Sequence, residues 1–195
     1  MRGQLTFISG GVRSGKSAFA ERQLVASARV AGGRLVYIAS GRAVDKEMQA
    51  RIEQHQHDRA DQQWTTIEQP VSLENVLPFI QPNDFVLWDC LTTWLANEMY
   101  EERADTFCIH VPGCMEKKAV QLLETVRQIR ERAAHFTIVS NEVLDELPSP
   151  LTETQQYSKW IGLLHQQLVH MADDAIEMDY GLPFYWKKEG QVTTR

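Results

Sequence analysis

The chain has 195 residues, of which 43% are hydrophobic and 24% are charged, and its formal net charge is −6 at pH 7. This length predicts a single domain over residues 1–195, and the apolar fraction is enough to form a buried core. The acidic balance argues against nucleic acid or an anionic membrane as the main partner, so an anionic substrate would need a local cationic site. The sequence shows neither a secretory signal nor a run of ~18 apolar residues. We therefore expect a cytoplasmic protein without a membrane span.

Apolar runs of strand length alternate along the chain with segments of helical length. Strands are expected at residues 5–9, 34–39, 64–68, 85–88, 136–140, 175–178 and 184–186. Helices are expected at residues 16–30, 45–59, 91–103, 116–134 and 155–171, and irregular segments at 106–113 and 144–150. The alternation predicts an α/β fold with a mostly parallel central sheet flanked by helices. Because ligands of such sheets bind beyond the carboxyl ends of the strands, the residues that follow each strand are candidates for a site.

The first predicted strand is followed by residues 10–17, GGVRSGKS, which fit the pattern G-x4-G-K-[ST]. The pattern lies between a strand and a helix, which is the context of a phosphate-binding loop. Glycines let backbone N–H groups approach phosphate oxygens, Lys16 supplies a cation for the β- and γ-phosphates, and the Ser17 hydroxyl suits Mg²⁺. A glycine-rich turn with a surface lysine is the alternative. The predicted phosphate site comprises Gly10, Gly11, Val12, Arg13, Ser14, Gly15, Lys16 and Ser17.

Asp89 follows the apolar run 85–88 and is the natural second ligand of a metal ion. A carboxylate after a buried strand holds the Mg²⁺ of many nucleoside triphosphatases. Asp89 could also cap the helix that is expected to follow it, and the two roles can coexist. The predicted metal ligands are thus Ser17 and Asp89.

The predicted helix 45–59 carries Arg51, His55 and Arg59 at positions i, i+4 and i+8, which places them on one face. The two guanidinium groups attract anions and disfavour the imidazolium, so His55 would be neutral and nucleophilic. A neutral imidazole can attack phosphorus and form a covalent phosphoramidate. A solvated helix face with a bystander histidine is the alternative.

The chain has three cysteines, an odd and sparse set that implies no disulfide framework. Cys108, His110 and Cys114 could be imagined as metal ligands. Zinc usually needs a fourth ligand and more closely paired spacing. We expect these three to be incidental residues of a loop.

The motifs together resemble the family of adenosylcobinamide kinase / adenosylcobinamide-phosphate guanylyltransferase, a bifunctional enzyme of cobalamin biosynthesis. The resemblance extends over most of the chain. It is carried by GGVRSGKS (10–17), YIAS (37–40), D-x-E-M-x-x-R-I-x-x-H-x-x-x-R (45–59), W-x-T-x-E (64–68), DCLTTWL (89–95), SNEV (140–143), G-x-x-x-Q-x-L (162–168), A-D (172–173) and G-L-P (181–183).

The resemblance implies a P-loop NTPase fold of the RecA-like kind, which would bind GTP and/or ATP with Mg²⁺. It implies phosphorylation of adenosylcobinamide and transfer of GMP from GTP to adenosylcobinamide phosphate, giving adenosyl-GDP-cobinamide. His55 would carry the GMP, and Lys16, Arg51 and Arg59 would stabilise charge. The family also implies a homotrimer. The nucleotide-binding positions that it adds to the loop are Gly41, Arg42, Gln56, His57, Asp58, Arg59, Glu68 and Asp89, of which we expect Glu68 to contact guanine.

The chain departs from the family pattern after residues 140–143. A glycine-rich stretch is replaced by residues 144–148, LDELP, and the arginines that usually follow are absent, with only Lys159 nearby. The N-Q pair that is usual in the family is replaced here by His165-Gln166. Guanylyl transfer is therefore expected more firmly than the kinase step. The alternatives are a P-loop kinase of another small alcohol and a nucleotide-dependent binding protein that has lost catalysis.

Overall fold

The computed structural model describes residues 2–42, 63–103, 106–144 and 150–193. Its centre is an eight-stranded sheet with the strand order β10-β9-β8-β1-β7-β4-β2-β3. Strands β1 to β4, β7 and β8 are parallel to one another, and β9 and β10 extend the sheet as antiparallel strands. The strands are β1 (Gln4–Gly10), β2 (Arg34–Ala39), β3 (Thr65–Glu68), β4 (Asp84–Asp89), β7 (His135–Asn141), β8 (Asp174–Asp179), β9 (Leu182–Lys188) and β10 (Gln191–Val192).

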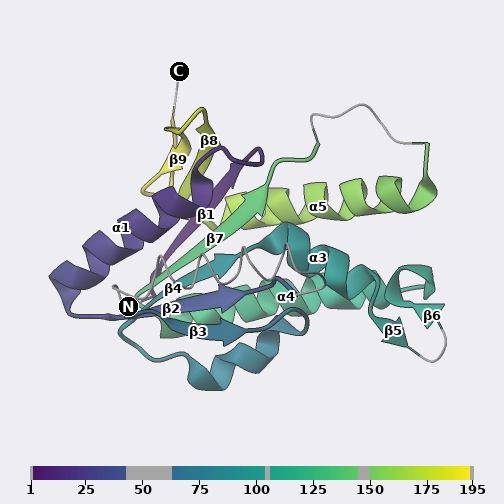
Figure 1. Cartoon of the computed structure of the whole chain (residues 1–195), viewed down its shortest axis with the longest axis horizontal. Helices are drawn as coiled ribbons and strands as arrows, with labels where there is room; N and C mark the ends of the chain where they lie inside the picture. Colours follow the sequence, from purple (N-terminus) through teal and green to yellow (C-terminus); the bar gives the residue numbers. More distant parts are fainter. Residues whose placement is uncertain (1, 43–62, 104–105, 145–149, 194–195) are drawn as a thin grey trace.

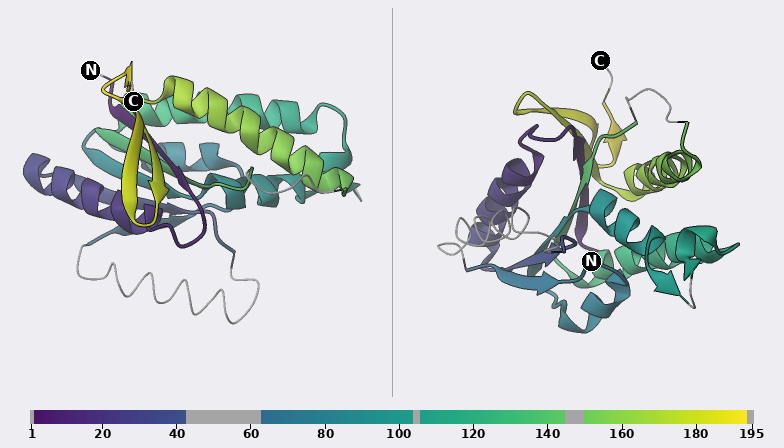
Figure 2. Two further views of the ribbon diagram at one scale, coloured as in Figure 1. Left: turned by 90° about the horizontal axis from the view of Figure 1, so that it is seen from above. Right: turned by 45° about the vertical axis from the view of Figure 1, so that its right-hand side comes forward.

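Helices cover both faces of the sheet, as Figures 1 and 2 show: α1 lies on one face, and α3, α4 and α5 lie on the other. A small hairpin of β5 and β6 lies beyond the end of α3 (Figure 1). These elements are α1 (Lys16–Ala31), α3 (Leu91–Met99), α4 (Cys114–Arg132), α5 (Thr152–Met171), the 3-10 helices η1 (Leu73–Phe79) and η2 (Cys108–His110), and the strands β5 (Glu102–Arg103) and β6 (Thr106–Phe107). No described helix combines the length and the hydrophobicity needed to cross a membrane.

Strand β4 shows why the central strands are continuous apolar runs. Phe85 and Leu87 join the core under α1, whereas Val86 and Trp88 join the larger core under α3, α4 and α5. Successive side chains point to opposite faces, and both faces are buried. Fully burying one such side chain contributes about 1.5–3 kcal/mol, so the sheet is held from both sides.

Most predicted strands and helices of the described residues are confirmed within a few residues, but α3 ends at Met99 rather than at 103. The chain turns back there: the Cys108 N–H donates to the Glu101 carbonyl at 3.2 Å, which closes the β5–β6 hairpin. Cys108 and Cys114 form a disulfide with a Cα–Cα separation of 5.6 Å. The expectation that these cysteines are incidental was therefore wrong, and the metal alternative for them is excluded as well. The predicted helix 45–59 lies outside the described residues.

Two histidines, the half-buried His135 and the buried His165, lie beside hydroxyl groups. His135 Nε2 lies 2.9 Å from Thr6 Oγ1, and His165 Nε2 lies 2.7 Å from Ser140 Oγ. Burial lowers the pKa of each imidazole to about 4. For His135, the carboxylates of Asp174 and Asp173 oppose this shift without cancelling it.

We predict that the protein loses stability between pH 7 and pH 5 because of these histidines. Their unfolded-state pKa is about 6.5, so below that pH the unfolded chain binds protons that the folded chain does not bind, and unfolding becomes easier. The loss at pH 5 is about 1–2 kcal/mol for each histidine. Urea unfolding at both pH values measures it, and His165→Gln should remove about half of the difference. An unchanged difference in that variant would contradict the assignment.

Candidate nucleotide-binding site

The carboxyl ends of the parallel strands form one edge of the sheet. Gly10 of β1 is in register with Asn141 of β7, and Asp89 of β4 is in register with Ala39 of β2. Ala39 is in turn paired with Glu68 of β3. The sheet therefore brings the glycine-rich loop and the two predicted carboxylates to the same edge, as parallel α/β folds do for their ligands.

The loop 10–17 joins β1 directly to the first turn of α1. Gly15 precedes the helix with φ 88° and Arg13 has φ 64°, so both residues are in left-handed conformations. The Phe19 N–H donates to the Gly15 carbonyl at 2.9 Å, and the Ser14 N–H donates to the Gly11 carbonyl at 3.1 Å. Left-handed residues before a helix N-terminus form a concave nest of backbone N–H groups, which suits an anion.

The neighbouring strands hold this loop at Gly10. A Cβ atom at Gly10 would lie 2.4 Å from the Met178 carbonyl oxygen and 2.7 Å from Ser14 Oγ, so only glycine fits. On the other side, the Glu142 N–H donates to the Gly10 carbonyl at 2.8 Å. The start of the loop is thus clamped between β8 and the end of β7.

Lys16 is buried at the N-terminus of α1, and its Nζ donates to the Gly11 carbonyl at 3.0 Å. Burial lowers the pKa of this ammonium group, and the nearby Asp89 and Cys90 raise it in part. A phosphate chain beside Lys16 would favour the charged form further, because opposite charges stabilise each other at short range.

Ser14 Oγ is buried and has no hydrogen-bond partner among the described residues. A buried hydroxyl without a partner is unfavourable by about 1–3 kcal/mol, which a ligand oxygen would offset. This orphan hydroxyl lies close to Gly10, at the start of the loop. The donors, the cation and the orphan hydroxyl fit a triphosphate.

Asp89 is half-buried at the end of β4. Because Leu87 faces α1, the alternation along the strand directs Asp89 to that face too, which is the side of Lys16. The idea that Asp89 caps α3 was wrong, because the capping position is Cys90. Ser17 is half-buried in the first turn of α1.

A hydroxyl and a carboxylate suit Mg²⁺, which keeps several waters and takes its remaining ligands from substrate phosphates. Such a site needs few protein ligands. A Mg²⁺ site with only two protein ligands does not require a cluster of three or more His, Cys, Asp or Glu side chains, and the described residues contain none suited to a metal ion.

Hydrogen bonds between elements support this edge, and they were not predictable from the sequence pattern. Asn141 Nδ2 donates to Thr92 Oγ1 at 3.0 Å, which joins the end of β7 to the first turn of α3. Asn97 Nδ2 donates to the Ser40 carbonyl at 2.9 Å, and Trp88 Nε1 donates to Ser40 Oγ at 2.8 Å. The motifs DCLTTWL and SNEV therefore contain residues that fix the strand ends.

The other predicted nucleotide contacts are placed only in part. Gly41 is half-buried and Arg42 is exposed after β2, and Glu68 is exposed at the end of β3. Glu68 lies two strands from Asp89, about 10 Å at the usual strand spacing. The remaining predicted site residues lie outside the described residues; they are Arg51, His55, Gln56, His57, Asp58 and Arg59.

The sheet with helices on both faces, together with the loop that joins β1 to α1, defines a P-loop NTPase. The chain belongs to the family described as cobinamide kinase / cobinamide phosphate guanyltransferase, whose sequence profile matches residues 6–185. It is 36% identical over 173 residues to the bifunctional adenosylcobalamin biosynthesis protein CobU of Escherichia coli, covering 87% of this chain and 92% of the relative. It is 34% identical over 185 residues to the bifunctional adenosylcobalamin biosynthesis protein CobP of Pseudomonas aeruginosa, covering 93% and 96%.

A solved structure supports the fold alone. The flagellar accessory protein FlaH of Methanocaldococcus jannaschii superimposes with a TM-score of 0.53 at 12% identity. The match covers 100% of this chain and 83% of that protein. The predicted P-loop NTPase fold and the predicted family are both confirmed.

Proposed function

We propose that this protein phosphorylates adenosylcobinamide and then transfers GMP from GTP to the resulting phosphate. The observation that carries the proposal is the loop 10–17, with Lys16 and Asp89 on the same side of the sheet edge, in a chain of the cobinamide kinase / cobinamide phosphate guanyltransferase family. Two of its relatives are named as bifunctional adenosylcobalamin biosynthesis proteins. Adenosylcobinamide and its phosphate would be the small-molecule partners.

The kinase step would transfer the γ-phosphoryl group of ATP or GTP to the hydroxyl of the aminopropanol arm. The hydroxyl oxygen forms the new bond to phosphorus, and the nucleoside diphosphate leaves. Catalysis of this reaction rests on positioning and on neutralising charge rather than on covalent chemistry. The backbone N–H groups of the loop and Lys16 would supply both.

Ser17 and Asp89 would hold Mg²⁺ at this edge. When bound, the ion would neutralise phosphate charge and orient the phosphate oxygens. Asp89 also partly raises the pKa of Lys16, so the carboxylate favours the charged lysine that the phosphates require.

The guanylyl step would use His55 as the nucleophile. Its neutral imidazole would attack the α-phosphorus of GTP, with pyrophosphate as the leaving group, and Arg51 and Arg59 would bind the phosphoryl oxygens. The phosphate of adenosylcobinamide phosphate would then displace GMP from His55. Glu68 suits guanine because the N1–H and N2 amine of that base are donors. Gly41, Arg42, Gln56, His57 and Asp58 would complete the contacts with this nucleotide.

Mass spectrometry of the intact protein after incubation with GTP and Mg²⁺ tests the guanylyl step. We expect a GMP adduct on the wild type that is lost on acid treatment and absent from His55→Ala. The control is His170→Ala, which removes an exposed histidine at the end of α5 and should keep the adduct. An adduct that persists in His55→Ala would remove His55 from the mechanism. Absence of any wild-type adduct, with phosphorylation intact, would favour a kinase without guanylyl transfer.

The homotrimer and the cytoplasmic location stay predictions. The molar mass in solution, measured by light scattering, would test the trimer.

A further inference from the structure

The turn between β8 and β9 contains Tyr180, a residue type that the backbone conformation at this position does not favour. Asp179 pairs with Leu182, so Tyr180 and Gly181 alone form the turn, with φ 47° and φ 81°. Two successive left-handed residues define a type I′ turn, whose first position favours asparagine, aspartate or glycine. A bulky aromatic residue with positive φ is an outlier. Burial does not explain it either, because the Tyr180 side chain is 93% exposed.

This turn lies directly against the phosphate loop. The Gly181 N–H donates to the Ser14 carbonyl at 3.2 Å. A Cβ atom at Gly15 would lie 3.6 Å from Gly181 Cα. Tyr180 is therefore an exposed aromatic side chain next to Gly181, the residue that contacts the loop proposed to bind the phosphates. An unfavourable conformation at such a place points to a functional role.

The strand order tells which end of a nucleotide would come near Tyr180. Lys16 and Asp89 would hold the β- and γ-phosphates and the metal ion, and Asp89 lies on β4, on the β7 side of β1. Strand β8 flanks β1 on the opposite side. With the γ-phosphate directed towards β4, the nucleoside end of the phosphate chain is directed towards β8 and its turn.

We propose that Tyr180 stacks on the base of the nucleoside triphosphate that donates its γ-phosphoryl group. This inference rests on the proposed function, and it adds a base subsite to it. Every nucleobase has a π-face, so an aromatic platform accepts adenine and guanine alike. The subsite therefore suits a kinase step that takes either ATP or GTP.

The base of the guanylyl donor would be bound elsewhere. Glu68, its proposed contact, lies on β3, five strands from β8 and roughly 20–25 Å away at the usual strand spacing. One base cannot contact both residues. The two reactions would thus place their nucleosides at different ends of the sheet edge while sharing the phosphate loop.

The test compares ATP with inorganic tripolyphosphate, which lacks the base. Tyr180→Asn installs a residue that the turn favours, so the variant should fold at least as well as the wild type. We expect Tyr180→Asn to raise the dissociation constant for ATP about tenfold or more, since loss of base stacking has effects of this size. Its dissociation constant for tripolyphosphate and its yield of the GMP adduct should not change. Tyr180→Phe should bind ATP like the wild type.

Trp186→Ala is the matched control, because it removes another exposed aromatic ring from the same hairpin. Trp186→Ala should leave the dissociation constants for ATP and tripolyphosphate and the yield of the GMP adduct unchanged. Equal ATP binding in Tyr180→Asn and the wild type would overturn the inference. A parallel loss of ATP and tripolyphosphate binding would overturn it too, because the turn would then only support the loop. If the wild type binds neither ATP nor tripolyphosphate, the proposed function is contradicted, and the inference that rests on it is contradicted as well.

Discussion

Lys16→Met is expected to lower the rate of adenosylcobinamide phosphorylation by about 10³-fold, the size of effect seen when one charge-stabilising group is lost. Lys16 is the cation of the loop: its Nζ donates to the Gly11 carbonyl, and the nearby Asp89 carboxylate partly raises its pKa. Methionine has a similar length and fills the same buried position without charge. The phosphoryl group being transferred would lose the ammonium group that neutralises its charge.

The same substitution should leave the fold intact or make it more stable. Burial lowers the pKa of Lys16, which means that the folded protein disfavours the charged form. Steady-state kinetics and urea unfolding of Lys16→Met measure the two effects. Lys117→Met, on the exposed side of α4, is the control for the loss of one positive charge. A rate in Lys16→Met within a few-fold of the wild type would contradict the role of Lys16.

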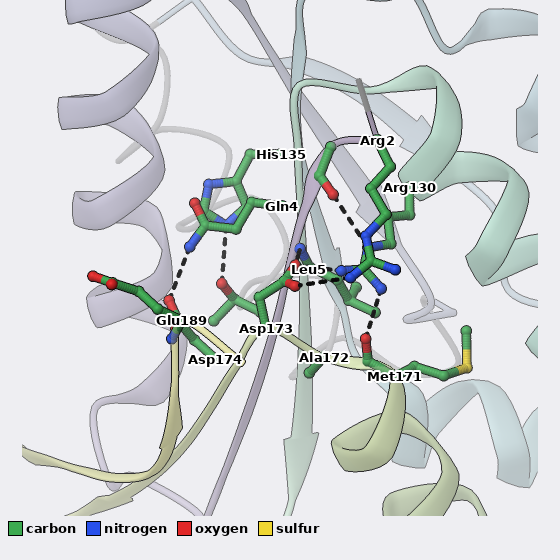
Figure 3. A network of polar contacts seen from close by, with 12 residues as sticks. Arg2, Gln4, Leu5, Arg130, His135, Met171, Ala172, Asp173, Asp174 and Glu189 are labelled. Atoms are coloured by element: carbon green, nitrogen blue, oxygen red, sulfur yellow. Dashed lines mark hydrogen bonds and ion pairs between the residues drawn. The ribbon is translucent and has the colours of Figure 1, made fainter. Parts of the chain in front are cut away.

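Arg130→Met is expected to destabilise the fold by about 2–3 kcal/mol, because it removes the hydrogen bonds of a buried guanidinium group to a half-buried carboxylate and two carbonyls. Arg130 is buried, and Figure 3 shows its guanidinium group among three segments. Its Nη2 lies 2.5 Å from Asp173 Oδ2, its Nη1 donates to the Met171 carbonyl at 2.7 Å, and its Nε donates to the Gly3 carbonyl at 3.1 Å. The side chain therefore ties α4 and the end of α5 to the start of β1.

The partner carboxylate of Asp173, which is half-buried, would lose its cation in this variant. Burial by itself raises the pKa of Asp173, but the Leu5 N–H and the Arg130 guanidinium outweigh it and hold the pKa below its usual value. A carboxylate with a lowered folded-state pKa stabilises the protein above its unfolded pKa, and this contribution is lost as the pH falls through the folded value. Without Arg130 that contribution shrinks, so Arg130→Met should unfold at a higher pH than the wild type during acid titration.

Arg127→Met is the matched control for this prediction. Arg127 lies on the same helix and makes contacts just as short, with Glu124 at 2.7 Å and Glu131 at 2.6 Å, but these pairs are exposed. Exposed ion pairs add little stability because water screens them. Urea unfolding should show a large loss for Arg130→Met and almost none for Arg127→Met. Equal losses would contradict the view that burial makes the Arg130 contacts important.

The strands and the loop were predictable because their signals are local. Strands buried on both faces, such as β1 and β4, are continuous apolar runs, and the G-x4-G-K-S pattern needs only its neighbouring strand and helix. The position of β7 between β1 and β4 was not predictable, because it depends on pairing between residues far apart in the sequence. The end of α3 was missed for a similar reason, because the β5–β6 hairpin that follows it depends on pairing between separate segments.

Contacts between residues far apart in the sequence also shape the candidate site, and these could not be predicted. Gly181 was visible only as part of a motif, and its contact with Ser14 joins residues that are distant in the sequence. The support of Asn141 by Thr92 also crosses between elements. Signals for such contacts are absent from a single sequence. A glycine between two predicted strands could have indicated the hairpin turn, but not what the turn contacts.

A crystal structure of the protein with a non-hydrolysable GTP analogue and Mg²⁺ tests the central claim most directly. We predict that the β- and γ-phosphates lie within the curve of residues 10–17, with backbone N–H groups and Lys16 Nζ donating to them. We predict the metal ion next to Ser17, on the side of Asp89. Phosphates bound anywhere else, with the loop empty of ligand, would contradict the account.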